Sequence, residues 1–177
     1  MPASSGKSSS RAPALRIGLI SDTHGLLRPE ALQAMRGSDY IVHAGDIGDP
    51  AILEQLAQIA PVTAVRGNND KGAEYAGIAE TDVLQAGEIL IYVIHDLNEI
   101  DLDPAAAEFQ VVVSGHSHKP SSRERDGVLY INPGSAGPRR FSLPIAAGVL
   151  HVSGKSVESE LFDLFASPSG RGRAKRG

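Results

Sequence analysis

Two pairs of side chains with metal-binding chemistry stand out in this sequence, each with one residue between its members. Asp22 and His24 follow the apolar run at 15–20, and His116 and His118 follow the run at 111–115. In extended backbone, residues two apart project to the same side, so each pair can reach into one small volume. Carboxylate and imidazole groups in such an arrangement can hold a metal ion or transfer protons.

Polar residues of the same kinds follow three further apolar runs. Asp46 comes after the run at 39–45, Asn68 after the run at 62–67, and His95 after the run at 89–94. A single residue of this kind at a strand end is usually unremarkable, but five successive runs that all end this way are hard to ascribe to chance. The candidate ligands are therefore Asp22, His24, Asp46, Asn68, His95, His116 and His118.

Seven ligands of this mix exceed what one ion needs. Two divalent ions about 3.5–4 Å apart, with one carboxylate bridging them, would use them all. The chain has no cysteine, so only oxygen and imidazole nitrogen can bind the ions. Manganese is the expected metal, with nickel, cobalt, iron, zinc or magnesium as alternatives.

Glycines accompany these ligands at Gly45, Gly67 and Gly115. We expect tight bends there that bring backbone close to the site. His43 lies three residues before Asp46 and is expected to support the ligands from behind, whereas His151 is expected to be an ordinary strand residue.

The elements that must position these residues alternate in type along the first half of the chain. The apolar runs are short and rich in Val and Ile, which predicts buried strands at 15–20, 39–45, 62–67, 89–94, 111–115, 127–134 and 146–152. Helices are expected at 28–35, at 49–59 with Asp49 as N-cap, and at 103–109. The pattern predicts an α/β fold with a sheet-on-sheet core of mixed sheets and helices outside. Ligands in such folds gather beyond the carboxyl ends of the strands.

Composition sets further bounds on the 177-residue chain. One domain is expected over 15–165, between a disordered lead-in at 1–14 and a flexible basic tail at 166–177. The formal net charge of −4 makes nucleic-acid binding an unlikely role, although the tail leaves it open as an alternative. No run is long enough to cross a membrane and no secretion signal is recognisable, so we expect a cytoplasmic protein.

The ordered motifs resemble those of the calcineurin-like metallophosphoesterase superfamily. They are SDTH at 21–24, AGDIGD at 44–49, RGNND at 66–70, VIHD at 93–96 and SGHSH at 114–118. The short chain and the NPGS segment at 132–135 resemble the small YfcE-like phosphodiesterase branch. The resemblance implies a four-layer α/β/β/α sandwich. It also implies one ion on Asp22, His24, Asp46 and His118, and a second on Asp46, Asn68, His95 and His116.

The sequence departs from the family pattern at two positions. Asn69 stands where the family usually has histidine, and Asp96 follows His95 where the family commonly has glycine. We expect Asn69 to donate a hydrogen bond to a phosphoryl oxygen, and Asp70 to orient His24 or His95. Asp96 is left open: it can repel a substrate, coordinate a metal or point away. Arg139 and Arg140 either clamp a phosphate or are solvated.

The resemblance predicts a phosphoesterase that cleaves phosphodiester bonds by attack of a hydroxide bridging two metal ions. The expected partner is a small phosphoester substrate, and a homo-oligomer is left open. The alternatives are a phosphomonoesterase or nucleotide hydrolase of the same fold, and a non-catalytic scaffold resembling the small retromer subunit.

Overall fold

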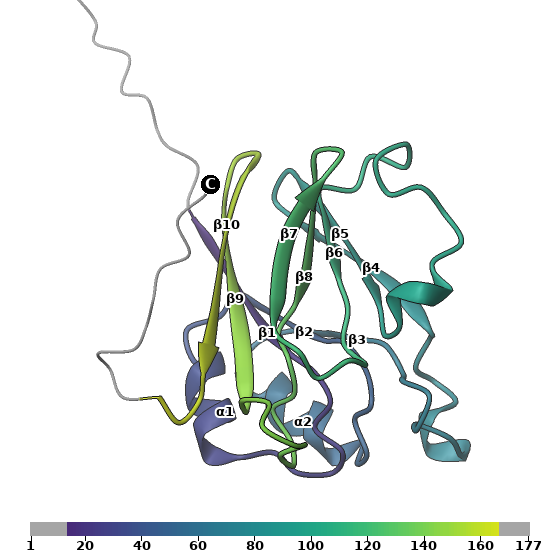
Figure 1. Cartoon of the computed structure of the whole chain (residues 1–177), viewed down its shortest axis with the longest axis vertical. Helices are drawn as coiled ribbons and strands as arrows, with labels where there is room; N and C mark the ends of the chain where they lie inside the picture. The colour runs from purple at the N-terminus through teal and green to yellow at the C-terminus, as the bar shows by residue number, and fades with distance from the viewer. Residues whose placement is uncertain (1–13, 167–177) are drawn as a thin grey trace, which may run out of the picture.

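The computed structural model describes residues 14–166, which form two five-stranded β-sheets packed face to face (Figure 1). The first sheet has the order β10-β9-β1-β2-β3. Its strands are β1 (Leu15–Ile20), β2 (Tyr40–His43), β3 (Val62–Ala64), β9 (Ala146–Ser153) and β10 (Ser156–Asp163). The second has the order β4-β5-β6-β8-β7. Its strands are β4 (Thr81–Ala86), β5 (Ile89–Ile94), β6 (Val111–Val113), β7 (Ser121–Arg125) and β8 (Val128–Asn132).

Both sheets are mixed, and each contains three adjacent parallel strands. In the first sheet β1 is parallel to β2 and β2 to β3, and in the second β5 is parallel to β6 and β6 to β8. The remaining pairs are antiparallel. The candidate ligands follow β1, β2, β3, β5 and β6, all members of these parallel groups, so each lies beyond a carboxyl end.

The main core lies between the sheets. Alternate side chains of each strand point inward, so Ile17 and Leu19 of β1 belong to the same buried cluster as Ile91 and Val93 of β5. The opposite face of the first sheet packs on the helices α1 (Pro29–Met35) and α2 (Ala51–Ala57). Pro50 occupies the N-cap position of α2, one residue later than expected, and Asp49 accepts a hydrogen bond from the backbone N–H of Ala51 at 2.9 Å in the first turn.

The outer face of the second sheet is covered without an α-helix. Tyr92 and Val112 pack against residues of the 97–109 segment, which holds the 3₁₀ helix η2 (Leu97–Glu99) and ends in Phe109. The prediction of a helix at 103–109 is therefore wrong. This stretch forms hydrogen-bonded turns, and they end at Glu108, whose backbone is in the left-handed conformation. A segment this short gains little from helix formation. A second 3₁₀ helix, η1 (Ala73–Tyr75), precedes β4.

Three strands, β4, β7 and β10, have no counterpart among the expected runs. All three are edge strands of their sheets. An edge strand pairs on one side only and often carries polar side chains, as β7 does throughout its sequence SSRER. An apolar pattern therefore does not reveal such strands. The two-sheet sandwich itself is confirmed, with η2 and its loop as the fourth layer.

Leu15 opens β1, where the domain is expected to begin, and β10 ends at Asp163. Almost all of the expected lead-in and tail, residues 1–13 and 167–177, lies outside the described residues. Among residues 14–166, no helix is long and apolar enough to cross a membrane.

Candidate metal centre

The backbone at the candidate ligands is in an unusual conformation. A positive φ is uncommon for any residue other than glycine, and it costs about 1–2 kcal/mol because Cβ crowds the following carbonyl. Five of the seven candidate ligands adopt it: Asp22 (54°), His24 (46°), Asp46 (52°), His116 (70°) and His118 (60°). Such strain concentrates at functional sites, where the surrounding structure enforces it.

Backbone hydrogen bonds enforce this conformation by joining the loops. Asp22 N–H donates to the carbonyl of Gly45 at 2.9 Å, and His24 N–H donates to the carbonyl of Asp46 at 2.9 Å. The loop after β1 and the loop after β2 therefore act as one frame, which brings the first two motifs together.

The three glycines lie where no side chain would fit, as the sequence predicts. A Cβ on Gly67 would lie 2.1 Å from Asp46 Oδ1, and one on Gly115 would lie 2.7 Å from Asp22 Oδ2. A Cβ on Gly45 would lie 2.6 Å from a ring nitrogen of His95. Each glycine thus lets its backbone pass directly behind a candidate ligand.

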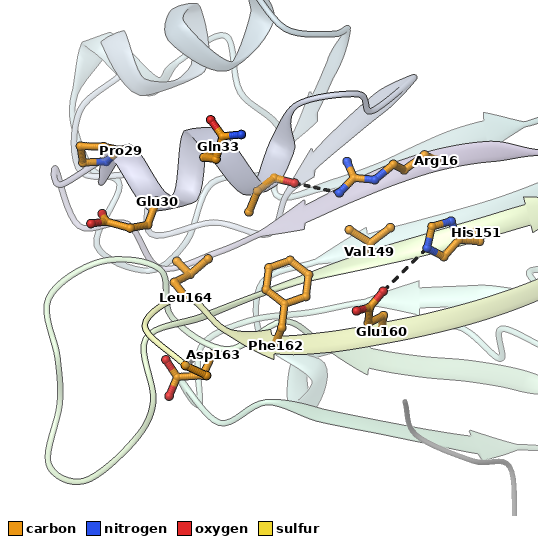
Figure 2. Close-up of a pocket in the computed structure, with 12 residues that line it drawn as sticks. Arg16, Pro29, Glu30, Gln33, Val149, His151, Glu160, Phe162, Asp163 and Leu164 are labelled. Atoms are coloured by element: carbon orange, nitrogen blue, oxygen red, sulfur yellow. Dashed lines mark hydrogen bonds and ion pairs between the residues drawn. The ribbon is translucent and has the colours of Figure 1, made fainter. Parts of the chain in front are cut away.

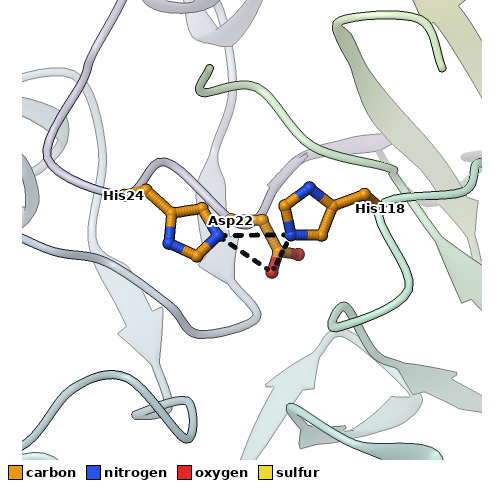
Figure 3. Close-up of side chains that lie close together, drawn as sticks. All are labelled: Asp22, His24 and His118. Carbon is orange, nitrogen blue, oxygen red and sulfur yellow. Dashed lines mark hydrogen bonds and ion pairs between the residues drawn. The ribbon is translucent and has the colours of Figure 1, made fainter. Parts of the chain in front are cut away.

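The first group of ligands is Asp22, His24 and His118 (Figure 3). His118 Nε2 lies 3.3 Å from Asp22 Oδ1 and 3.2 Å from His24 Nε2, and His24 Nε2 lies 3.8 Å from Asp22 Oδ1. Asp22 and His118 are buried, and the His24 side chain is only 19% exposed. The other Asp22 oxygen, Oδ2, accepts hydrogen bonds from Ser21 Oγ at 2.7 Å and from the backbone N–H of His116 at 3.1 Å, so Oδ1 alone faces the histidines.

Asp46 lies between this group and His95. Its Oδ2 is 3.7 Å from His24 Nε2 and 3.4 Å from His95 Nε2. The Nδ1–H of His95 donates to the carbonyl of Ala44 at 2.7 Å. The lone pair of the neutral ring is therefore on Nε2 and is directed at the carboxylates. Asp22 also approaches His95, with Oδ1 4.0 Å from Nε2, so both carboxylates lie among histidines of both expected ion sites.

The remaining two ligands, Asn68 and His116, lie on the exposed side. His116 Nδ1 is 3.1 Å from Asn68 Oδ1, and the His116 side chain is 43% exposed. The His116 ring meets the His95 ring edge-on at 5.2 Å between centroids. The tertiary structure therefore brings all seven candidate ligands into one cluster that is closed at Asp22 and open at His116.

The donor atoms are spaced as ligands of bound cations would be. A ligand nitrogen or oxygen lies about 2.0–2.2 Å from a divalent ion, which puts neighbouring donors of one ion about 2.8–3.6 Å apart. The closest pairs, between 3.1 and 3.4 Å, fall within this range. Buried Asp22 Oδ1 and His95 Nε2 also have no hydrogen-bond partner among the described residues. Unsatisfied buried groups are costly, and divalent cations would satisfy them, so the donor set fits such ions.

The pKa shifts of His24 and Asp46 favour cation binding, whereas that of His95 favours the protonated ring, whose proton a cation would have to displace. Burial lowers the pKa of His24, against the opposing charges of Asp46 and Asp22. Burial acts to raise the pKa of Asp46, but the nearby imidazole of His95 and the hydrogen bonds from Asn69 outweigh it and lower that pKa. Burial likewise opposes the charged form of His95, yet Asp46 and the Ala44 carbonyl raise its pKa. Asp46 is thus ionised and His24 neutral at neutral pH, the forms that bind metal.

One predicted role needs correction. Asp70 does not orient His24 or His95: its buried carboxylate accepts backbone N–H bonds from Ile47 at 3.0 Å, Gly48 at 3.0 Å and Gly67 at 2.8 Å. It therefore ties the loop after β3 to the loop after β2.

The Asn69 side chain is also engaged within the protein. Its Nδ2 donates to Asp46 Oδ2 at 2.8 Å, and its backbone N–H donates to Asp46 Oδ1 at 3.0 Å. In this structure Asn69 therefore orients Asp46, and its amide does not point freely towards a substrate position. Its expected bond to a phosphoryl oxygen stays a prediction.

His43 supports the site from behind, as the sequence predicts. It is fully buried, its Nδ1 accepts from Gly45 N–H at 3.2 Å, and its Nε2 lies 2.9 Å from Thr23 Oγ1. Thr23 in turn donates to the carbonyl of Ile47 at 2.8 Å. His43 thus links the two ligand loops through Thr23, whose role no sequence motif indicates because its hydroxyl is not itself a candidate ligand.

The other side chains singled out in the sequence lie farther out. His151 is exposed on β9, 3.9 Å from Glu160, as expected of an ordinary strand residue. Arg139 folds back on its own loop, 3.5 Å from the carbonyl of Leu143. Arg140 is exposed and lies at the rim of the site. Burial of His24 is the main cause of its lowered pKa, and the positive charge of Arg140 adds to that effect.

Two hollows adjoin these elements. A groove of about 610 Å³ runs between α1 and the β9–β10 pair, with Glu30, His151 and Phe162 in its lining (Figure 2). It contains none of the seven candidate ligands. A smaller hollow of about 390 Å³ includes Asn68 and Lys71 in its lining and therefore adjoins the candidate centre.

Comparison with known sequences agrees with this site. The calcineurin-like phosphoesterase superfamily domain matches residues 15–155. A probable metallophosphoesterase from Methanothermobacter thermautotrophicus is 35% identical over 156 residues, which cover 82% of this chain and 90% of that protein. The phosphodiesterase YfcE from Escherichia coli is 27% identical over 161 residues, covering 77% of this chain and 87% of that protein.

Solved structures share the fold. Vacuolar protein sorting 29 from Cryptosporidium parvum has a TM-score of 0.73 at 22% identity, covering 85% of this chain and 91% of that one. Escherichia coli YfcE has a TM-score of 0.61 at 21% identity, covering 85% and 100%. With its motifs in order and its ligands gathered beyond the strand ends, the chain belongs to the calcineurin-like phosphoesterase superfamily.

Proposed function

We propose that this protein is a dinuclear metal-dependent phosphodiesterase that acts on a small phosphoester. The observation that carries the proposal is the position of Asp46, whose Oδ2 lies 3.7 Å from His24 and 3.4 Å from His95. These histidines belong to different expected ion sites, so one carboxylate oxygen is within reach of both. The phosphodiesterase YfcE, similar along most of this chain, supports the choice of a diester substrate.

Each ligand has a distinct part in this proposal. Asp22, His24 and His118 would hold the inner cation, Asn68, His95 and His116 would hold the outer cation, and Asp46 would contribute to both. The bound cations supply an activated water as nucleophile and neutralise the charge that develops on the phosphoryl oxygens. Manganese is the proposed metal, since the donors are carboxylate, amide and imidazole groups.

The residues around the ligands decide what substrates suit the site. Asn69 cannot titrate, so it cannot protonate a leaving oxygen as the usual histidine could. Such proton transfer is commonly worth about 10²–10⁴-fold in rate. We therefore expect good leaving groups, such as aryl alcohols, to be cleaved far faster than alkyl alcohols.

The test combines metal binding with a chromogenic assay. With Mn²⁺, the wild-type protein should hydrolyse bis(p-nitrophenyl) phosphate. Removing a residue that only supports a metal ligand commonly lowers activity by roughly 10–100-fold, and Asp46→Asn should lower the hydrolysis rate by more than that. Its manganese content should fall as well, because Asp46 contacts both groups. Asp101→Asn, which removes an exposed carboxylate elsewhere, is the matched control and should behave as wild type. Full metal content and full rate in Asp46→Asn would refute the two-metal assignment.

Two other functions are separated by the same assay. A phosphomonoesterase of this fold would prefer p-nitrophenyl phosphate to the diester. A scaffold would hydrolyse neither ester with any divalent ion. The likeness to vacuolar protein sorting 29 concerns the fold alone, and the full set of ligating side chains favours the enzyme.

A further inference from the structure

Asp96, which stands where the family commonly has glycine, has two oxygens with different environments. Oδ1 accepts hydrogen bonds from the backbone N–H and the side-chain Nδ2 of Asn98, both at 3.0 Å, and so caps η2. Oδ2 faces the site instead, 3.6 Å from His116 Nε2. The side chain is 22% exposed, so the capping bonds hold it against the rim rather than in solvent.

The two nitrogens of His116 are used on opposite sides of its ring. Nδ1 lies 3.1 Å from Asn68 Oδ1, the other exposed ligand of the outer cation, while Nε2 faces Asp96. An imidazole that binds a metal through one nitrogen usually donates its other N–H to a carboxylate or carbonyl. Within the same site, His95 follows this rule through the carbonyl of Ala44.

His116 needs such a partner more than the other histidines do. Its side chain is 43% exposed, against 19% for His24, 5% for His95 and 3% for His118. Packing therefore does little to fix the ring, and polar neighbours must orient it. Among the described residues, the His116 side chain contacts Asn68, Asp96 and the edge-on ring of His95.

We propose that Asp96 is a positioning residue that orients His116 and strengthens it as a ligand of the outer cation. When a cation binds, the carboxylate holds Nε2 as the N–H side of the ring, so Nδ1, which donates to Asn68 Oδ1 in the metal-free protein, can offer its lone pair to the cation beside Asn68. The separation of 3.6 Å is that of an ion pair, slightly longer than a direct hydrogen bond. This inference rests on the outer cation of the proposed function, but not on its substrate or its reaction.

The test measures Mn²⁺ binding by calorimetry, without any substrate. Asp96→Asn should weaken binding at the outer site by about 10–100-fold and leave the inner site unchanged. The metal-free variant should unfold at the wild-type temperature, because the asparagine oxygen can still cap Asn98. Asp103→Asn is the control: Asp103 also caps a turn, at 3.0 Å from Ala105 N–H, but lies outside the ligand cluster. It should bind both ions as wild type does.

A double-mutant cycle separates positioning from direct ligation. His116→Ala should lose outer-site affinity, and adding Asp96→Asn to it should cost nothing further, since Asp96 acts through the missing ring. A further loss in the double variant would show that Asp96 binds the metal itself and would overturn the proposal. Unchanged outer-site affinity in Asp96→Asn, or a single Mn²⁺ bound by the wild type, would also overturn it. A wild type that binds two ions but cleaves no phosphoester would refute the proposed function and leave this inference standing.

Discussion

Lowering the pH should destabilise the protein through one buried histidine, His43. Its Nδ1 accepts the N–H of Gly45 and its Nε2–H reaches Thr23, so the neutral ring satisfies both neighbours. Burial, opposed by the charges of Asp22 and Asp70, lowers the pKa of His43 from 6.5 to about 4. A proton added at Nδ1 would replace the bond from Gly45 with a clash between two donors.

The sign and size follow from proton linkage. Between pH 6.5 and 4 the unfolded chain binds a proton at His43 that the folded protein does not, so the free energy of unfolding falls as the pH falls. The loss from this residue is about 2 kcal/mol at pH 5 and about 3 kcal/mol at pH 4, relative to pH 8. For a small domain this is a substantial part of the total stability.

The assay is urea unfolding followed by circular dichroism between pH 8 and pH 4, with a chelator present so that metal release does not contribute. The stability of wild type should fall by about 2 kcal/mol more than that of His43→Gln between pH 8 and pH 5. His151→Gln replaces an exposed histidine and should keep the wild-type pH dependence. Parallel curves for wild type and His43→Gln would refute the reasoning. If His43→Gln does not fold, NMR of the wild type gives the same test. The ring signals of His43 should then not titrate between pH 7 and 5.

Two further predictions concern residues that bind no metal. Gly67→Ala places a methyl group 2.1 Å from Asp46 Oδ1 and 2.4 Å from its backbone nitrogen, so calorimetry should find Mn²⁺ binding largely lost, whereas Gly77→Ala, with open space around it, should bind normally. Asp70→Ala removes the acceptor of three backbone N–H groups and should lower the free energy of unfolding by at least about 3 kcal/mol in urea. A loss below about 1 kcal/mol would mean that water replaces this carboxylate.

The seven candidate ligands and their places at strand ends could be predicted from the amino-acid sequence. The strand at 15–20 is placed to the residue, because a short run rich in Leu and Ile is local information. The need for glycine at 45, 67 and 115 could also be predicted, since each adjoins a candidate ligand at a bend. The polar edge strands could not, because their pairing partners rather than their own pattern make them strands.

Only the tertiary structure decided what the polar side chains beside the ligands do. Asp70 bonds to Ile47 and Gly48, more than 20 residues earlier, and Asp96 meets His116, 20 residues later. A motif fixes which groups are present, but a carboxylate takes the donors that folding places beside it. Those neighbours come from separate loops that follow adjacent strands of one sheet, so their distances depend on how the strands pair and not on spacing along the chain.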